Sequence, residues 1–138
     1  MKQLFTSATI LLISLCAFVI MSGFSGYQAK KPWTAPDAFK SKKNPVGANA
    51  ESIAAGKVLW STHCKSCHGT KGLGDGSKAA QLKTEPGDFS KADVQAQADG
   101  SLFYKTSEGR DDMPSFKKKI ADEDDRWSLV NYIRTFKK

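Results

Sequence analysis

Apolar residues follow two different patterns along this chain. No charged residue occurs between Leu4 and Phe24, and a dense apolar stretch runs from Ile10 to Met21. Beyond this run, apolar residues are interspersed among polar ones and recur at helical spacing. The pattern predicts a hydrophobic N-terminal helix within residues 1–26, followed by a polar part built from amphipathic helices.

Two long helices are predicted in the polar part. Asn49 can cap a helix that begins just after it and carries Trp60 on its apolar face. Asp122 can cap a second helix that runs to about Phe136, with Asp125 at the capping-box position. A broad apolar face on the second helix consists of Trp127, Leu129, Val130, Tyr132, Ile133 and Phe136.

Between these helices, shorter ones are predicted over Ser77–Lys83 and from Asp99 or Ser101 to Ser107. No segment alternates apolar and polar residues as a half-buried strand does. Residues 50–138 are therefore expected to form one all-α, loop-rich domain. A domain of about 90 residues buries only a modest core.

Residues 27–49 differ in composition from both neighbours. They contain three prolines, five lysines and few apolar residues. One interpretation is a tether between the hydrophobic segment and the domain, which reaches at most ~75 Å when extended. The other is a segment that lies on the domain, docked by Trp33 and Phe39. The sequence supports a division into residues 1–26, 27–49 and 50–138 and leaves both interpretations open.

The most specific motif is Cys64-Lys65-Ser66-Cys67-His68. This C-x-x-C-H spacing is the attachment site of a c-type haem, in which both thiols bond the porphyrin and the histidine binds the iron. A zinc site that includes His63 is an alternative, but such sites usually separate the His pair from the Cys pair. A redox dithiol would need a βα pattern that is missing here. The motif predicts one covalent haem on Cys64 and Cys67, with His68 as the proximal iron ligand.

A second iron ligand is expected from Met113. Met1 is the initiator and Met21 lies in the hydrophobic run, which leaves this methionine of the three. The alternative is a gap-filling core methionine. However, Met113 lies in a polar, turn-like segment, and Pro114 restricts it to extended conformations. With His68, it would give the Met/His ligation typical of cytochromes c.

The chain resembles a class I c-type cytochrome of the small bacterial single-haem kind. The resemblance covers about residues 50–136 and rests on Gly56–Trp60, Cys64–Gly69, Gly72–Gly76, Met113–Phe116 and Trp127–Phe136. It implies a helical domain wrapped around the haem, in which the first and last helices cross closely. It also implies that Gly56 faces Tyr132 or its neighbours at this crossing.

The N-terminal segment is expected to direct export. Its charge-free run of about 21 residues is long enough to span a bilayer, which favours an uncleaved membrane anchor. A cleaved signal peptide and a lipid-modified Cys16 are the alternatives; no clear cleavage site follows the run. The resemblance implies haem attachment on the outer side of a bacterial inner membrane, with the domain in the periplasm.

The net charge of +7, from 21 basic and 14 acidic residues, suggests acidic partners. Lysines near the haem motifs would speed encounters with acidic surfaces on redox proteins. These partners would be a quinol-oxidising complex, a terminal oxidase or a dehydrogenase. The candidate lysines are Lys65, Lys71, Lys78, Lys83, Lys117, Lys118 and Lys119. The compartment excludes nucleic acid, and no small-molecule substrate is expected.

The leading hypothesis is a membrane-tethered electron carrier with one haem and no catalytic residues. A second hypothesis is a fixed cytochrome subunit of a larger membrane oxidoreductase complex. A third is a haem peroxidase or gas sensor, which would need an open sixth position on the iron; Met113 argues against it. The sequence leaves the redox potential and the identities of donor and acceptor open.

Overall fold

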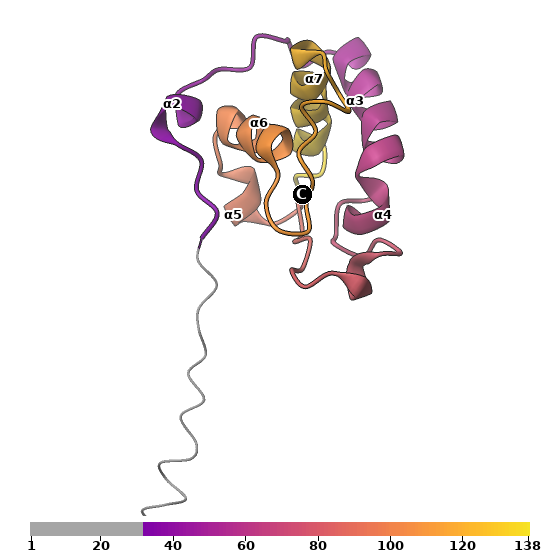
Figure 1. The fold of residues 1–138 in the computed structure, drawn as a ribbon. Helices are drawn as coiled ribbons and strands as arrows, with labels where there is room; N and C mark the ends of the chain where they lie inside the picture. Colours follow the sequence, from indigo (N-terminus) through magenta and orange to yellow (C-terminus); the bar gives the residue numbers. More distant parts are fainter. Residues whose placement is uncertain (1–31) are drawn as a thin grey trace, which may run out of the picture. The chain divides into compact units, whose positions relative to one another are not determined.

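The computed structural model describes residues 32–138, and the predicted hydrophobic helix with Cys16 lies outside them. The elements are α2 (Asp37–Lys40), α3 (Ala50–His63), α4 (Lys65–His68), the 3₁₀ helix η1 (Ala79–Gln81), α5 (Ala92–Gln95), α6 (Asp99–Glu108) and α7 (Glu123–Arg134). Figure 1 shows them joined by long loops. Residues 32–138 contain no strand, only an isolated bridge between Arg110 and Met113. The predicted all-α domain is confirmed.

The two long helices begin where the sequence predicts. Asn49 accepts a hydrogen bond from the Ser52 backbone N–H, and the Ser52 hydroxyl accepts one from the Asn49 N–H. Asp122 caps α7 by accepting from the N–H of Asp124 at 2.9 Å. No reciprocal bond from Asp125 is formed, so the predicted capping box is wrong for α7. The Asp122 carboxylate bonds the second N–H of the helix, that of Asp124, and not the third, so the reciprocal pair of a capping box is not formed.

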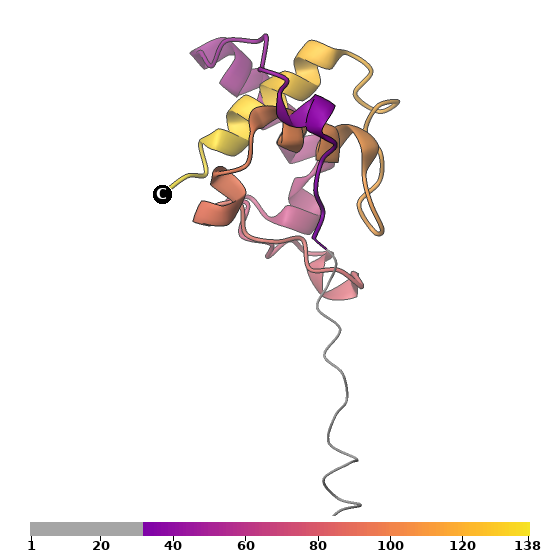
Figure 2. The same cartoon turned by 90° about the vertical axis from the view of Figure 1, so that its left-hand side faces the viewer.

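Helices α3 and α7 cross at Gly56. A Cβ atom at this position would lie 2.2 Å from the Ser128 carbonyl oxygen and 2.8 Å from the Cβ of Tyr132. Only a residue without a side chain allows this approach, so the contact implied by the resemblance is present. Figures 1 and 2 both show the two helices lying against each other.

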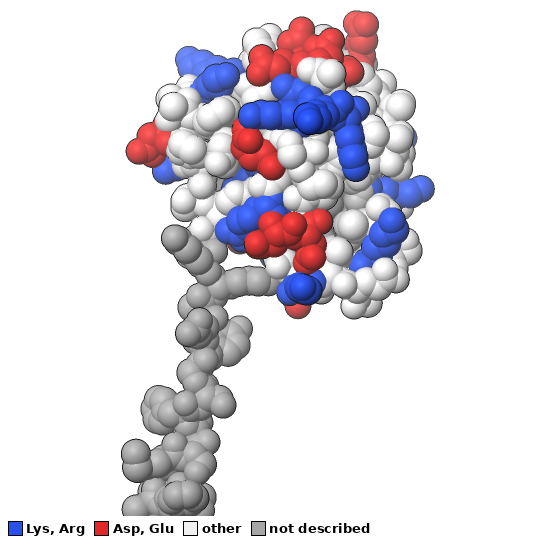
Figure 3. Space-filling model, viewed as in Figure 1, with Lys and Arg blue, Asp and Glu red and all other residues white. Residues whose placement is uncertain are grey.

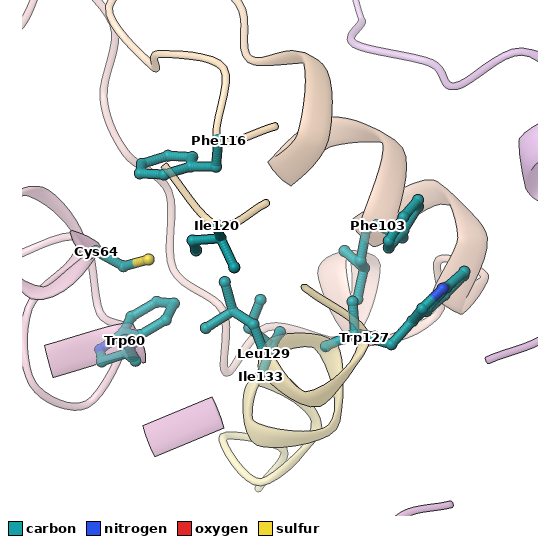
Figure 4. Close-up of a cluster of buried hydrophobic side chains, with 10 residues drawn as sticks. Trp60, Cys64, Phe103, Phe116, Ile120, Trp127, Leu129 and Ile133 are labelled. Atoms are coloured by element: carbon teal, nitrogen blue, oxygen red, sulfur yellow. The ribbon is translucent and has the colours of Figure 1, made fainter. Parts of the chain in front are cut away.

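The core lies between α3, α6, α7 and the segment before α7 (Figure 4). Phe103 of α6 stacks on Trp127 of α7, with ring centroids 4.0 Å apart and planes 12° from parallel. Leu129, Val130 and Ile133 are nearly inaccessible to solvent, as the predicted apolar face of α7 requires. Tyr132 and Phe136 are half-buried at its edge.

The segment before α3 lies on the domain, and the compact unit begins at Thr34. The Asn44 amide donates to the side chain of Asn131 at 2.8 Å, and the Asn131 amide donates to the Val46 carbonyl at 3.1 Å. Phe39 packs on Tyr104 with a centroid distance of 4.8 Å. For the described residues from Thr34 onward, the docked interpretation of the proline- and lysine-rich segment is therefore the correct one.

The shorter elements were predicted less well. The helix expected over Ser77–Lys83 is a 3₁₀ turn of three residues, whereas the helix expected up to Ser107 spans Asp99–Glu108. Helices α2, α4 and α5 have four residues each and were not predicted. No helix within residues 32–138 has the length and apolar character needed to cross a membrane.

Candidate haem-binding site

The C-x-x-C-H motif forms a helical turn directly after α3. The backbone N–H groups of Cys67 and His68 both donate to the Cys64 carbonyl, at 3.1 and 2.9 Å. In a helical turn, residues three and four positions apart lie on the same face. The turn therefore places Cys64, Cys67 and His68 on one face, as attachment to one porphyrin requires.

The His68 ring is held between aromatic side chains. Its centroid lies 4.9 Å from that of Phe89 and 5.6 Å from that of Trp60. The Nδ1 atom is buried and has no hydrogen-bond partner among the described residues. Burial lowers the pKa of His68 to about 4, against a smaller opposing effect of the Pro86 carbonyl. The imidazole is therefore neutral at pH 7, the form that binds a metal.

Two hydrogen bonds fix the position of this turn. The buried indole N–H of Trp60 donates to the Gly69 carbonyl at 3.0 Å, and the Gly74 N–H donates to the His68 carbonyl at 2.9 Å. Gly76 lies so close to the turn that a Cβ atom there would be 2.5 Å from the Cys67 carbonyl carbon. The glycine-rich loop after the motif therefore closes against its backbone.

The two cysteines have different surroundings. Neither forms a disulfide within residues 32–138, but Cys64 is buried in the hydrophobic core whereas Cys67 is half-buried. Burial, with a smaller contribution from Cys67, raises the pKa of the Cys64 thiol to about 12. Figure 4 shows the Cys64 sulfur pointing toward Ile120, a residue of the segment between Met113 and α7. Apolar surroundings of this kind suit a thioether better than a thiolate.

Met113 ends a tight turn. The N–H of Arg110 donates to the Met113 carbonyl at 2.8 Å, and the N–H of Met113 donates back to the Arg110 carbonyl at 2.9 Å. Asp111 within this turn has a φ of 53°. The Met113 side chain is half-buried and packs against the same hydrophobic cluster that includes Cys64. The structure thus brings the predicted distal ligand and one predicted attachment thiol to one apolar cluster.

Sequence reasoning missed the polar groups that hold this turn. The Ser115 hydroxyl donates to the Ser107 carbonyl at 2.6 Å. One carboxylate oxygen of Asp112 accepts from the backbone N–H groups of Lys83 and Thr84, at 2.8 and 3.1 Å. Neither residue type is unusual in a loop, so no sequence signal distinguished them. Their partners become neighbours only after the chain folds.

Arg126 is a third missed residue. It is 5% exposed, and its guanidinium donates to the Ser107 hydroxyl at 3.1 Å and to the Ala121 carbonyl at 3.0 Å, with a further short bond to the Ile120 carbonyl. A buried charge is tolerated when such acceptors surround it. Arg126 thereby ties α7 to α6 and to the segment that leads from Met113.

The residues fit a covalently attached haem. The two thiols lie on one helical turn beside a neutral, buried imidazole whose Nδ1 lacks a partner within residues 32–138. Met113 packs at the same cluster as Cys64. Within the described part of the chain, no group of three or more His, Cys, Asp or Glu side chains is arranged to hold a metal ion. The zinc alternative therefore has no formed site there.

The chain matches one protein-family model and several solved structures. The family model described as "Cytochrome C oxidase, cbb3-type, subunit III" matches residues 51–133, which is more than half of the chain. No curated protein sequence matches significantly.

The fold is also similar to that of several solved structures. The first belongs to the Kuenenia stuttgartiensis reducing HAO-like protein complex Kustc0457/Kustc0458, with a TM-score of 0.63 and 24% identity over 83% of this chain. This chain spans 54% of that protein, and the likeness shows the fold alone. The second is the KustC0563 c-type cytochrome, with a TM-score of 0.51 and 31% identity. The match covers 60% of this chain and 98% of that one.

The family match covers nearly all of α3 and α7 together with the C-x-x-C-H turn and the Met113 turn. The resemblance to a small single-haem c-type cytochrome is confirmed, and with it the covalent haem c. This chain belongs to the family of cbb3-type cytochrome c oxidase subunit III and is a c-type cytochrome, an electron-transfer protein.

Proposed function

We propose that this cytochrome carries single electrons between respiratory-chain proteins, with haem attached through Cys64 and Cys67 and iron bound by His68 and Met113. The observation that carries this assignment is the His68 ring: it is neutral, buried between Trp60 and Phe89, and has a Nδ1 atom without a partner among the described residues. When bound, the haem supplies a one-electron Fe(III)/Fe(II) couple.

The protein holds the two proposed iron ligands in place and keeps water away from the haem. The hydrogen bond from Trp60 to Gly69 and the two aromatic contacts hold the His68 ring. The Arg110–Met113 pair and the Ser115 hydroxyl hold the Met113 turn. A site filled at both axial positions favours electron transfer over chemistry on a bound substrate.

The test is the absorption spectrum of the purified holoprotein in both redox states. A low-spin c-type spectrum with a methionine-to-iron charge-transfer band is expected, and Met113→Ala should abolish that band. His63→Ala is the matched control, since His63 lies beside Cys64 and contacts Phe116 instead, at 6.0 Å between ring centroids. A high-spin wild-type spectrum would overturn the assignment and favour the sensor or peroxidase hypothesis.

We also propose that the domain is exported and tethered to the outer face of the inner membrane by the segment over residues 1–26. Because the compact unit of the domain begins at Thr34, the seven residues 27–33 that join it to this segment can span at most about 25 Å. The haem domain would then stay near the membrane surface. The intact mass of the native protein distinguishes a retained anchor from a cleaved signal or a lipid on Cys16.

For the partners, we propose redox proteins with acidic docking surfaces. Lys117, Lys118 and Lys119 are exposed beside Phe116, although Lys117 is paired with Glu108. The face drawn in Figure 3 carries basic and acidic side chains together, so steering would come from local groups of lysines. Electron-transfer rates should fall with rising salt and fall further in Lys118→Glu than in Lys43→Glu. A flat salt response would contradict the proposal.

The second candidate function is that of a fixed subunit in a larger oxidoreductase. Two observations favour it: the family is described by an oxidase subunit, and one structural neighbour is part of a redox complex. Gentle solubilisation followed by size analysis separates the two functions. A free monomer supports the mobile carrier, whereas co-migration with other redox proteins supports the subunit.

A further inference from the structure

The segment Gly109–Phe116, called here the methionine loop, is tied to α6 at both ends. At its start, the Gly109 N–H donates to the Lys105 carbonyl at 3.0 Å. At its end, the Phe116 N–H donates to the Thr106 carbonyl at 3.3 Å, and Ser115 bonds the Ser107 carbonyl. These bonds fix the two ends of the loop to one helix and leave its tip to be held by other contacts.

Asp112 at the tip makes contacts of a different kind. Its carboxylate accepts from the N–H groups of Lys83 and Thr84, which precede it by 29 and 28 residues. These donors belong to the segment that follows η1, and η1 in turn lies against α4 of the haem-attachment turn. The carboxylate therefore connects the methionine loop to the part of the chain that leads from the proposed proximal ligand.

We propose that Asp112 is a positioning residue for Met113, in that it holds the tip of the methionine loop and so keeps the thioether at the iron. The proposal rests on the proposed ligation of iron by Met113. Asp112 precedes Met113 directly, so its two hydrogen bonds restrain the backbone at the ligand itself.

Two physical reasons give Asp112 this role. A thioether is a neutral ligand, so its hold on iron depends strongly on how well the protein presents it. A carboxylate that accepts two backbone N–H groups makes charge-assisted bonds, which are stronger than bonds between neutral groups. Because the bonds are exposed to solvent, their loss should not unfold the core. It should let the Met113 thioether leave the iron more easily.

The experiment is a titration of the ferric holoprotein with imidazole, which binds the iron after displacing the distal ligand. Asp112→Ala removes both hydrogen bonds and should raise the apparent affinity for imidazole about fivefold to tenfold, and tenfold corresponds to about 1.4 kcal/mol. Asp112→Asn keeps an acceptor oxygen but loses the charge, so its affinity should lie between that of the wild type and that of Asp112→Ala.

Asp111→Asn is the matched control. It removes the same charge one position away, from a side chain that pairs with Arg110 at 3.4 Å and does not reach the 83–84 segment. Asparagine tolerates the positive φ of this position. The control should bind imidazole as the wild type does. Equal increases in Asp112→Ala, Asp112→Asn and Asp111→Asn would show a charge effect and overturn the positioning role.

Hydrogen exchange provides a readout that does not depend on the iron. The amides of Lys83 and Thr84 should be protected in the wild-type holoprotein and should exchange faster in Asp112→Ala, while those of α7 stay unchanged. Unprotected amides in the wild type would overturn the proposal.

Met113→Ala separates this proposal from the ligand assignment. If Met113→Ala binds imidazole no more tightly than the wild type, the assignment of the distal ligand fails. If Met113→Ala binds more tightly but Asp112→Ala does not, the positioning role of Asp112 fails alone.

Discussion

The two walls of the proposed haem site are built in different ways. On the proximal side, His68 follows a long helix and lies against Trp60 and Phe89. On the distal side, Met113 ends a tight turn in a loop that is held mainly by single hydrogen bonds. The proximal ligand is positioned by burial of large apolar surfaces, whereas the distal ligand is positioned by a few polar contacts.

This difference has an energetic consequence. Burial of an aromatic side chain stabilises a fold by several kcal/mol, whereas one hydrogen bond contributes about 1 kcal/mol net. Damage to the proximal wall should therefore unfold the domain. Damage to the distal wall should loosen the methionine and leave the domain folded.

The largest expected effect is that of Trp60→Ala. Trp60 is 2% exposed and contacts the rings of His68, Phe89 and Phe136. Its truncation leaves a large cavity and should lower the free energy of unfolding by about 4 kcal/mol. Urea denaturation of the holoprotein, followed by helical circular dichroism, measures this loss.

Val58→Ala is the control on the same helix. Val58 is 66% exposed, so the change should stay within about 0.5 kcal/mol. Similar losses for the two variants would mean that the aromatic cluster does not dominate the proximal wall.

A smaller effect is expected for Gly109→Ala, on the distal side. Gly109 has φ 70° and ψ 172°, a region open essentially to glycine only. A Cβ atom there would also lie 2.4 Å from the Met113 carbonyl oxygen. The variant's free energy of unfolding should fall by about 2 kcal/mol. During denaturation, the methionine charge-transfer band should disappear before the helices unfold.

Gly87→Ala separates strain from steric pressure on Met113. Gly87 also has a positive φ, 78°, but a Cβ atom there meets nothing within 4 Å. The free energy of unfolding of this control should fall by about 1 kcal/mol, and its charge-transfer band should remain. If both variants lost the band, backbone strain alone would explain the result.

The smallest effect is expected for Ser115→Ala, which removes the bond to the Ser107 carbonyl. Loss of this bond should reduce stability by about 1 kcal/mol and speed displacement of the methionine by imidazole in stopped-flow mixing. The control Thr62→Ala removes an exposed bond within α3 and should leave the displacement rate unchanged. Equal rates in all three proteins would show that Ser115 does not hold the loop.

The sequence predicts the proximal wall better than the distal one. Capping at Asn49 and the apolar face of α7 depend on spacing within a helix, and a local pattern reveals them. The close crossing at Gly56 is expected only from the resemblance to class I cytochromes. Asp112 and Arg126 bond backbone groups of other segments. Any polar residue in a loop could serve in this way, so only the folded chain identifies the ones that do.

The docked segment shows a second limit of sequence reasoning. Its prolines and lysines are equally compatible with a free tether and with a segment that lies on the domain. The decision rests on Asn44 and Asn131, which lie 87 residues apart and bond each other. No local pattern encodes such a pair, whereas the C-x-x-C-H spacing is complete within five residues.

The burial of Cys64 has a consequence for the order of biosynthesis. In the folded chain this thiol is inaccessible, and its pKa of about 12 leaves almost no reactive thiolate. The residues that enclose it come from segments far apart in the sequence. We therefore expect covalent attachment of the haem to take place before the core closes around Cys64.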